Sequence, residues 1–311
     1  MDKSHRTSRA GTALGLLAIL FWSTTFAVSR SLAEEVGVLT AASAMLIGGG
    51  VLGCLYVALV ERRLAALFRL PRAYLVGCGL LFVAYMVCLF PAIGLAASRQ
   101  QTIEVGIVNY LWPGLTLVFA IPILRTRVRW SFFAGIAMAA AGAALAPLRM
   151  GEYSAAAMLE TLRTNPLPYA LALVGAVVWA LYSTLSRRWA GAAEGGAMPL
   201  FTLAAGLVLA AIRPAFDEPC AWSWRAGAEL AFMAVFPVML AYAFWDRAMR
   251  RGNVTLVAAI SYLTPLLSTV LSALYLGVDL GWSLWLACGL IVAGAALAHC
   301  SVVRISVSPH V

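Results

Sequence analysis

Two prolines occupy equivalent places in two apolar segments that lie 152 residues apart. The segment NYLWP ends at Pro113, and the segment SYLTP ends at Pro265. A proline inside a helix has no amide hydrogen, so the carbonyl four residues earlier loses its usual donor. The carbonyls freed in this way belong to Asn109 and Ser261, which also carry polar side chains. Two free acceptors in apolar surroundings predict a site for a ligand with N–H donors.

A tyrosine follows each freed carbonyl directly. Tyr110 comes after Asn109, and Tyr262 comes after Ser261. An ammonium group near such rings gains roughly 0.5 to 2 kcal/mol from cation–π attraction, in addition to hydrogen bonds to the carbonyls. We therefore expect these four residues to bind an ammonium group. The alternative is that the prolines only kink the helices for packing, with neighbours satisfying the carbonyls.

Two tryptophans are candidates for the wall of the same site. Trp22 and Trp179 begin two similar segments, WSTTFAVSRS and WALYSTLSRR, and Tyr182 lies one turn beyond Trp179. Such rings stack on apolar or aromatic groups, and an indole N–H donates to a carboxylate. Anchoring at the membrane interface is the alternative role. We expect these three residues to line a cavity. Further candidates of the same kind are Tyr85, Trp112 and Tyr242.

Charged side chains that could bind or relay protons or ions are scarce in the apolar segments. A charge at the centre of a bilayer costs at least ~2.5 to 3.5 kcal/mol and is normally kept for ion or proton work. Glu104 comes closest to such a position, and a structural role at the rim is its alternative. We expect no charge in the middle of any other span. The six cysteines show no CxxC spacing, so neither a metal site nor a cofactor is expected.

These candidate residues lie in a chain that is 63% hydrophobic and 11% charged, far from the composition of a soluble domain. Ten long intervals carry no charged residue, and most of them approach the ~20 residues that cross a bilayer. They are continuously apolar, whereas the strands of an outer-membrane barrel alternate. The intervals are 10–29, 36–60, 73–98, 105–124, 130–148, 164–186, 195–212, 230–245, 252–278 and 280–303. The sequence predicts an all-α integral membrane protein with ten transmembrane helices.

The chain also repeats itself at the same offset of 152 residues. AGAALA occurs at 141–146 and again at 293–298. We predict one membrane domain made of two five-helix halves, 1–150 and 151–311. Five helices is an odd number, so the second half must be inverted in the membrane. Such 5+5 inverted repeats are typical of secondary transporters with a site near the midplane.

The positive charges set the predicted orientation. Of the 22 Lys and Arg, 16 fall on the side of the N-terminus and six on the other side. This bias places both termini in the cytoplasm. It also explains the net charge of +9 without any nucleic acid partner.

Three segments resemble a known family. The segments LLAILFWSTTFAVSRSL in the first helix and AYAFWDRAMRRG in the eighth resemble the drug/metabolite transporter superfamily, in its EamA-type exporter branch. The segment ASRQQTIEVGIVNYLWPGLTLVFAIPIL is similar to the aromatic amino acid exporter group of that branch. The resemblance implies a basket-shaped bundle that exports amino acids across a bacterial inner membrane.

The predicted function is therefore export of aromatic and other neutral amino acids by alternating access. The lack of a mid-span carboxylate favours a uniporter, and we expect a monomer in the lipid bilayer. The alternative is a proton-coupled exporter of another small metabolite or drug. An enzyme is not expected, because the three histidines lie near the termini and no HExxH motif, paired-Asp motif or phosphate loop is present.

Overall fold

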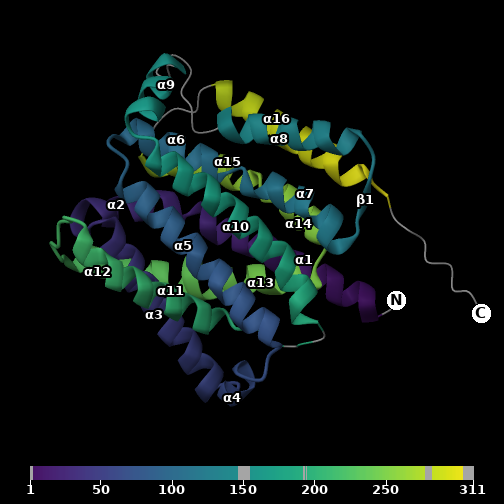
Figure 1. The fold of residues 1–311 in the computed structure, drawn as a ribbon, viewed down its shortest axis with the longest axis horizontal. Coiled ribbons are helices and arrows are strands. Elements are labelled where there is room, and N and C mark those ends of the chain that lie inside the picture. Colours follow the sequence, from purple (N-terminus) through teal and green to yellow (C-terminus); the bar gives the residue numbers. More distant parts are fainter. Residues whose placement is uncertain (1–2, 146–154, 192, 194, 277–281, 304–311) are drawn as a thin grey trace, which may run out of the picture.

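The computed structural model of the chain describes residues 3–145, 155–191, 193, 195–276 and 282–303. In these parts the chain is almost entirely helical, and the helices form one bundle (Figure 1). The elements of the first part are α1 (Lys3–Ser23), α2 (Thr25–Val36), α3 (Val38–Leu59), α4 (Leu64–Leu67), the π-helical segment η1 (Ala73–Cys78), α5 (Gly79–Gly94), α6 (Arg99–Asn109), α7 (Trp112–Leu124), β1 (Arg127–Val128) and α8 (Ser131–Leu145). The elements that follow are α9 (Ala155–Thr164), α10 (Leu167–Ala190), α11 (Met198–Ile212), the 3-10 turn η2 (Arg213–Ala215), α12 (Trp224–Met233), the π-helical segment η3 (Ala234–Leu240), α13 (Ala241–Arg251), α14 (Val254–Ile260), α15 (Leu263–Leu276), α16 (Trp282–Cys300) and β2 (Val302–Val303).

Six helical stretches of the described chain are long and apolar enough to cross a membrane. They are Val38–Leu59, Ala73–Gly94, Glu104–Leu124, Leu167–Ala190, Met198–Ala215 and Trp224–Arg251. Four shorter apolar stretches are Arg9–Ser23, Ser131–Leu145, Val254–Ser268 and Trp285–Cys300. Each stretch falls on a different apolar interval of the sequence. The protein is therefore helical and embedded in a membrane, while the predicted boundary at residues 150 and 151 lies outside the described chain.

Three of the predicted helices are interrupted. The first is divided at Thr24, the fourth at Tyr110 and Leu111, and the ninth at Ser261 and Tyr262. The two prolines, which the sequence predicts as helix breaks within the fourth and ninth spans, are in the first turn of the helices α7 and α15. Proline is tolerated in a first turn, because the amides there have no partner within the helix.

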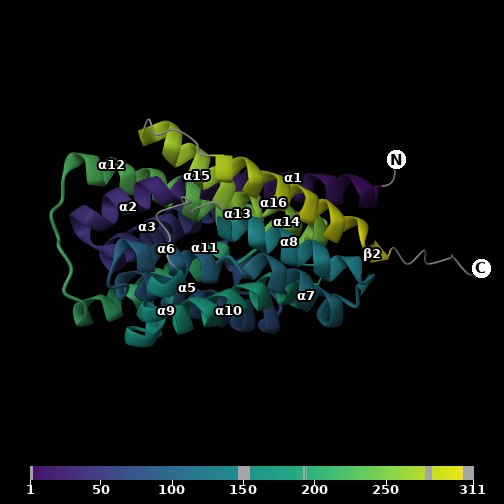
Figure 2. The same ribbon diagram turned by 90° about the horizontal axis from the view of Figure 1, so that it is seen from above.

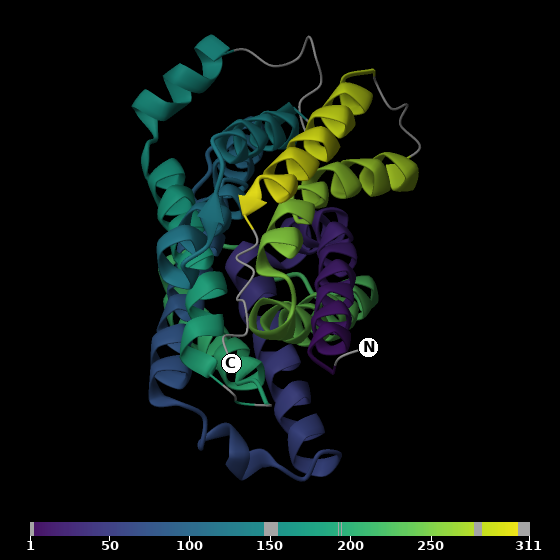
Figure 3. The same cartoon turned by 90° about the vertical axis from the view of Figure 1, so that its right-hand side faces the viewer.

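The helices pack in close pairs, and glycine allows the closest contacts. Pairs with extensive contact are α8 with α16, α3 with α11, α5 with α10 and α1 with α13. A Cβ atom added to Gly135 would lie 2.7 Å from the Gly294 carbonyl oxygen, so α8 and α16 touch through their backbones. Figure 3 shows these two helices together at the top of the view, with the loop that carries α4 at the bottom.

The bundle has two distinguishable ends. The start of α1 and the strand β2 lie toward the same end (Figure 2). There β2 pairs antiparallel with β1, with Arg127 opposite Val303. This two-residue pairing is the only strand structure of the described chain, and it joins the segment after α7 to the segment after α16.

Candidate functional site

A cavity of about 360 Å³ lies where the interrupted helices meet. Its walls come from α2, α3, α5, α6, α10, α13 and α15, from the π-helical segment η3, and from the helix ends at Trp22, Trp112 and Met233. Tyrosine and tryptophan make up much of the surface. The ring residues of these two types are Trp22, Tyr85, Tyr110, Trp112, Trp179 and Tyr242. This volume is near the lower end of the range for small-molecule pockets, and the aromatic wall suits an apolar or aromatic ligand.

Five of the predicted site residues line this cavity. They are Trp22, Asn109, Tyr110, Trp179 and Pro265. The further candidates Tyr85, Trp112 and Tyr242 line it as well. Five other predicted residues are not part of the described wall: Glu104, Pro113, Tyr182, Ser261 and Tyr262.

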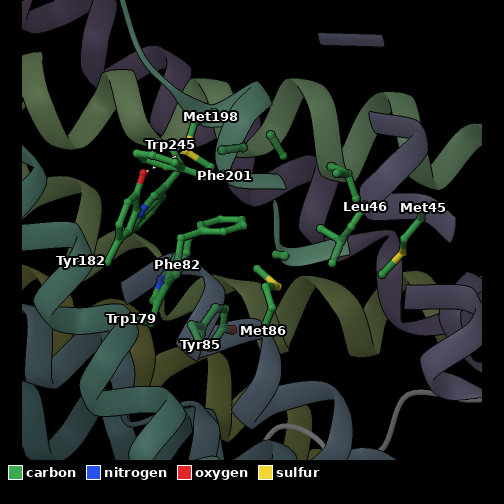
Figure 4. Packing of buried hydrophobic residues seen from close by; sticks show 14 of the residues in the cluster. Met45, Leu46, Phe82, Tyr85, Met86, Trp179, Tyr182, Met198, Phe201 and Trp245 are labelled. Carbon is green, nitrogen blue, oxygen red and sulfur yellow. Dashed lines mark hydrogen bonds between the residues drawn. The ribbon is translucent and has the colours of Figure 1, made fainter. Parts of the chain in front are cut away.

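Trp179 is the centre of the aromatic cluster, and Figure 4 shows its ring beside those of Phe82 and Tyr85. Its ring centroid lies 4.7 Å from that of Tyr85 and 5.8 Å from that of Trp22. The Trp22 indole N–H donates to the Pro237 carbonyl oxygen at 3.1 Å. The Trp22 donor is therefore occupied by the protein and is not available to a substrate carboxylate.

Tyr182 lies one layer behind the cavity, on the far side of Trp179. The two rings are stacked at 5.1 Å, and Tyr182 is fully buried. Its hydroxyl donates to Asp246 Oδ1 at 3.0 Å. Although Tyr182 is one helical turn from Trp179, it is not in the described wall of the cavity and instead packs against the ring of Trp179, which is part of that wall.

The break at Ser261 and Tyr262 differs from the break at Tyr110 and Leu111 in the state of its freed carbonyl. The Thr264 amide donates to the Ser261 carbonyl oxygen at 3.0 Å, so this acceptor is already used. Tyr262 packs between α8 and α16 with Ala139 and Ile291. The structure therefore does not bring Ser261 and Tyr262 into the described wall of the cavity. The reason is a tight turn that redirects the freed carbonyl to a local amide.

At the break at Tyr110 and Leu111, the acceptors of Asn109 have no partner within the described chain. No backbone amide of the described chain donates to the Asn109 carbonyl oxygen. The side-chain Oδ1 of Asn109 is also buried without a hydrogen-bond partner among the described residues. Thr264 Oγ1, in α15, is likewise buried without a hydrogen-bond partner among the described residues. The two side chains are 8% and 6% exposed and both line the cavity, so a ligand could satisfy them.

Glu104 lies behind the wall of the cavity and is fully buried. Its carboxylate accepts hydrogen bonds from the hydroxyls of Tyr169 and Thr161. The Tyr169 and Thr161 hydroxyl oxygens are also 2.8 Å apart. Glu104 thus joins α6 to α9 and α10, and its neighbour Val105 lines the cavity.

Asp246 is a buried charge that the sequence did not single out, because it directly follows the apolar interval 230–245. Its side chain is 1% exposed. Oδ1 accepts the hydroxyl of Tyr74 at 2.9 Å as well as that of Tyr182, and Oδ2 lies 2.8 Å from Arg250 Nε. The spacing of four residues between Asp246 and Arg250 was the available signal.

Comparison with known proteins places the chain in a family. The EamA-like transporter family pattern matches residues 9–147 and again residues 166–299. The chain is similar to the aromatic amino acid exporter YddG of Salmonella typhimurium, with 34% identity over 94% of this chain and 97% of the relative. The Escherichia coli protein of the same name is 33% identical with the same coverage.

A third relative and a solved structure agree with this result. YddG of Ancylobacter novellus is 34% identical over 93% of this chain and 96% of the relative. A solved crystal structure superimposes with a TM-score of 0.77 and 29% identity, over 93% of this chain and 97% of the other. The chain therefore belongs to the EamA-like transporter family, so it is a membrane transporter and not an enzyme.

Proposed function

We propose that the protein exports neutral amino acids, aromatic and other large apolar ones included, by alternating access. The observation that carries this proposal is the aromatic cavity at the junction of two interrupted helices, where the lining residue Asn109 has a buried Oδ1 without a hydrogen-bond partner among the described residues. An amino acid supplies an ammonium group for such acceptors and an apolar side chain for the rings. The names of the three relatives support the same substrate class.

The proposed architecture is ten transmembrane helices in two inverted halves. The helix pairs support it. Under an exchange of the halves, α1 corresponds to α10 and α13 corresponds to α5, and both α1 with α13 and α10 with α5 are packed pairs. The π-helical segments η1 and η3 precede α5 and α13, which are equivalent helices under the same exchange. The two matches of the family pattern, one in each half, also support it.

We infer that the cavity opens toward the outer side, with the inner side closed. Thr25 and Ser29 line the cavity near Arg30, and Thr102 lines it near Arg99. The charge bias assigns both arginines to the outer side. On the inner side, the group of Tyr74, Tyr182, Asp246 and Arg250 ties three helices together. We call this group the inner latch, and its release would accompany inward opening.

Uniport is the proposed energetics, in the inner membrane of a bacterium and with the protein as a monomer without nucleic acid. The described residues of the cavity wall include no Asp, Glu, Lys, Arg or His. Asp246 is neutralised by Arg250, and Glu104 is held by two hydroxyls. Coupling to protons is the second candidate, and the full burial of Glu104 beside the cavity favours it.

Counterflow tests the proposed function directly. Liposomes with purified protein and loaded with phenylalanine should accumulate labelled phenylalanine when the inner and outer pH are equal, because a uniporter needs only the substrate gradient. The Glu104→Gln variant should retain this exchange. Exchange that depends strictly on a pH gradient and is lost in the variant would establish proton coupling through Glu104.

The Pro113→Ala variant tests whether the proline contributes to substrate binding or only shapes the helix. The alanine amide can donate to the Asn109 carbonyl, so an acceptor for the ligand is lost while the helix gains a hydrogen bond. We expect phenylalanine affinity to fall about tenfold, as for the loss of one hydrogen bond to a charged group. Melting temperature in detergent should not fall. Calorimetric titration and thermal unfolding measure the two quantities.

Two further variants control this experiment. Pro122→Ala changes a proline in the same helix that does not line the cavity, so its affinity should match the unmodified protein. Asn109→Ala should also weaken binding, and its effect should be less than additive with Pro113→Ala, because both act on one acceptor group. Unchanged phenylalanine affinity in Pro113→Ala, in Asn109→Ala and in the double variant would mean that the proline only shapes the helix.

A further inference from the structure

The cavity treats the two charged ends of an amino acid unequally. Acceptors for an ammonium group are present and unused: Asn109 Oδ1 and Thr264 Oγ1 are both more than nine-tenths buried and have no partner among the described residues. The wall also carries the rings of tyrosine and tryptophan, whose faces attract cations. A protonated amine therefore finds hydrogen bonds and a favourable field in the same place.

A carboxylate finds no positive charge there. The described wall contains no Lys, Arg or His. The Trp22 indole is already bonded to the Pro237 carbonyl, and the Trp245 indole behind the wall donates to Ser183 Oγ at 3.2 Å. Only neutral donors remain, such as the Trp179 indole and the Thr264 hydroxyl, which can donate as well as accept. Burying an anion without a cation or a full set of donors is costly.

The helix ends that meet the cavity do not compensate for this lack. The starts of α7 and α15 would normally offer free amides to an anion. Pro113 removes one amide from the first turn of α7, and Pro265 removes one from α15. The Thr264 amide is already donated to the Ser261 carbonyl. The prolines that free a carbonyl also remove donors, so both effects favour a cation over an anion.

We propose that the cavity recognises the amine and not the carboxylate, so that it also binds aromatic primary amines and amino acid amides. This inference rests on the proposed function, because it concerns the same site. The substrate class widens from zwitterions to cations of similar size in which a ring is joined to a protonated amine. Asn109 and Thr264 are the residues that determine this specificity.

Four probes test the proposal on purified protein in detergent, in a mildly acidic buffer that keeps all the amines protonated. They are phenylalanine, phenylalanine amide, 2-phenylethylamine and 3-phenylpropanoate, and calorimetric titration gives each dissociation constant. The two cations should bind within about threefold of phenylalanine or more tightly, and the propanoate at least about tenfold more weakly. The reverse order, with both cations tenfold weaker than phenylalanine, would overturn the proposal.

The outcome also distinguishes this inference from the proposed function. If phenylalanine does not bind but the two cations do, amino acid export fails as the function while amine recognition stands. If phenylalanine and the propanoate bind and the cations do not, export can stand and the inference fails. Absence of binding by all four probes would reject both.

Two substitutions locate the recognition. Thr264→Val keeps the shape of the side chain and removes its oxygen, and Asn109→Leu removes the amide. Each substitution should weaken the binding of 2-phenylethylamine by about tenfold, the usual effect of losing a hydrogen bond to a charged group. Thr202→Val is the matched control, because Thr202 is equally buried but lies in α11 and donates to the Met198 carbonyl. Equal affinity in Thr264→Val and Thr202→Val would remove Thr264 from the site.

Discussion

Asp246→Asn is expected to lower the free energy of unfolding by about 3 to 5 kcal/mol, the usual cost of breaking a buried ion pair. The carboxylate is 1% exposed, and the Arg250 side chain that it neutralises is 5% exposed. Without it, the guanidinium is left buried, and one acceptor for the phenols of Tyr74 and Tyr182 is weakened. Thermal and denaturant unfolding in detergent would measure the loss.

A second ion pair of the same spacing provides the control. Arg225 and Glu229 are also four residues apart, and Arg225 Nε lies 2.8 Å from Glu229 Oε1. The Arg225 side chain, however, is 62% exposed. Arg225→Gln should therefore cost less than about 1 kcal/mol, whereas Arg250→Gln should cost several times more. The double variant Asp246→Asn with Arg250→Gln should be more stable than the sum of the single effects predicts. Equal effects at Arg225 and Arg250 would contradict a buried inner latch.

The Asp246→Asn variant should also loosen the packing on the inner side of the transporter. Cys78 is fully buried in η1, the segment that also carries Tyr74. With Cys78 kept as the sole cysteine, a polar thiol reagent should modify it faster in Asp246→Asn than in the protein with an intact latch. An unchanged rate, together with lowered stability, would mean that the latch supports the fold without closing the inner side.

Trp179→Ala is expected to abolish measurable substrate binding and to destabilise the bundle by about 3 to 5 kcal/mol, as for other buried tryptophans. The side chain is 2% exposed, and its ring contacts those of Trp22, Tyr85 and Tyr242 in the cavity wall. Its removal would leave a void between the cavity and Tyr182. Titration with phenylalanine and thermal unfolding would measure the two effects.

Two other substitutions separate packing from recognition. Trp179→Phe preserves a ring, so it should recover most of the stability and part of the affinity. Trp224→Ala removes a tryptophan that is 91% exposed and lies outside the cavity, so neither quantity should change appreciably. If Trp179→Ala binds phenylalanine as well as Trp224→Ala does, Trp179 does not form part of the binding wall.

The sequence by itself predicted the helical membrane class and the interruptions at the two prolines. These features are local, because an apolar run of sufficient length must be helical in lipid and a proline must lose an amide donor. The repeat was also visible, since its register survives in letters such as NYLWP and SYLTP. Trp22, Asn109, Tyr110 and Trp179 could be singled out as candidates because each is aromatic or polar in an apolar run, and all four line the cavity.

Only the tertiary structure decided which of the paired residues face the cavity. Tyr110 and Tyr262 follow equivalent breaks, yet Tyr110 lines the cavity and Tyr262 packs between α8 and α16. Asp246 is buried because Tyr74, 172 residues away, and Tyr182, 64 residues away, bring their hydroxyls to it. Such partners depend on the rotation of each helix about its axis and on its neighbours. These are set by contacts between distant segments, and the pattern of letters along one helix does not contain them.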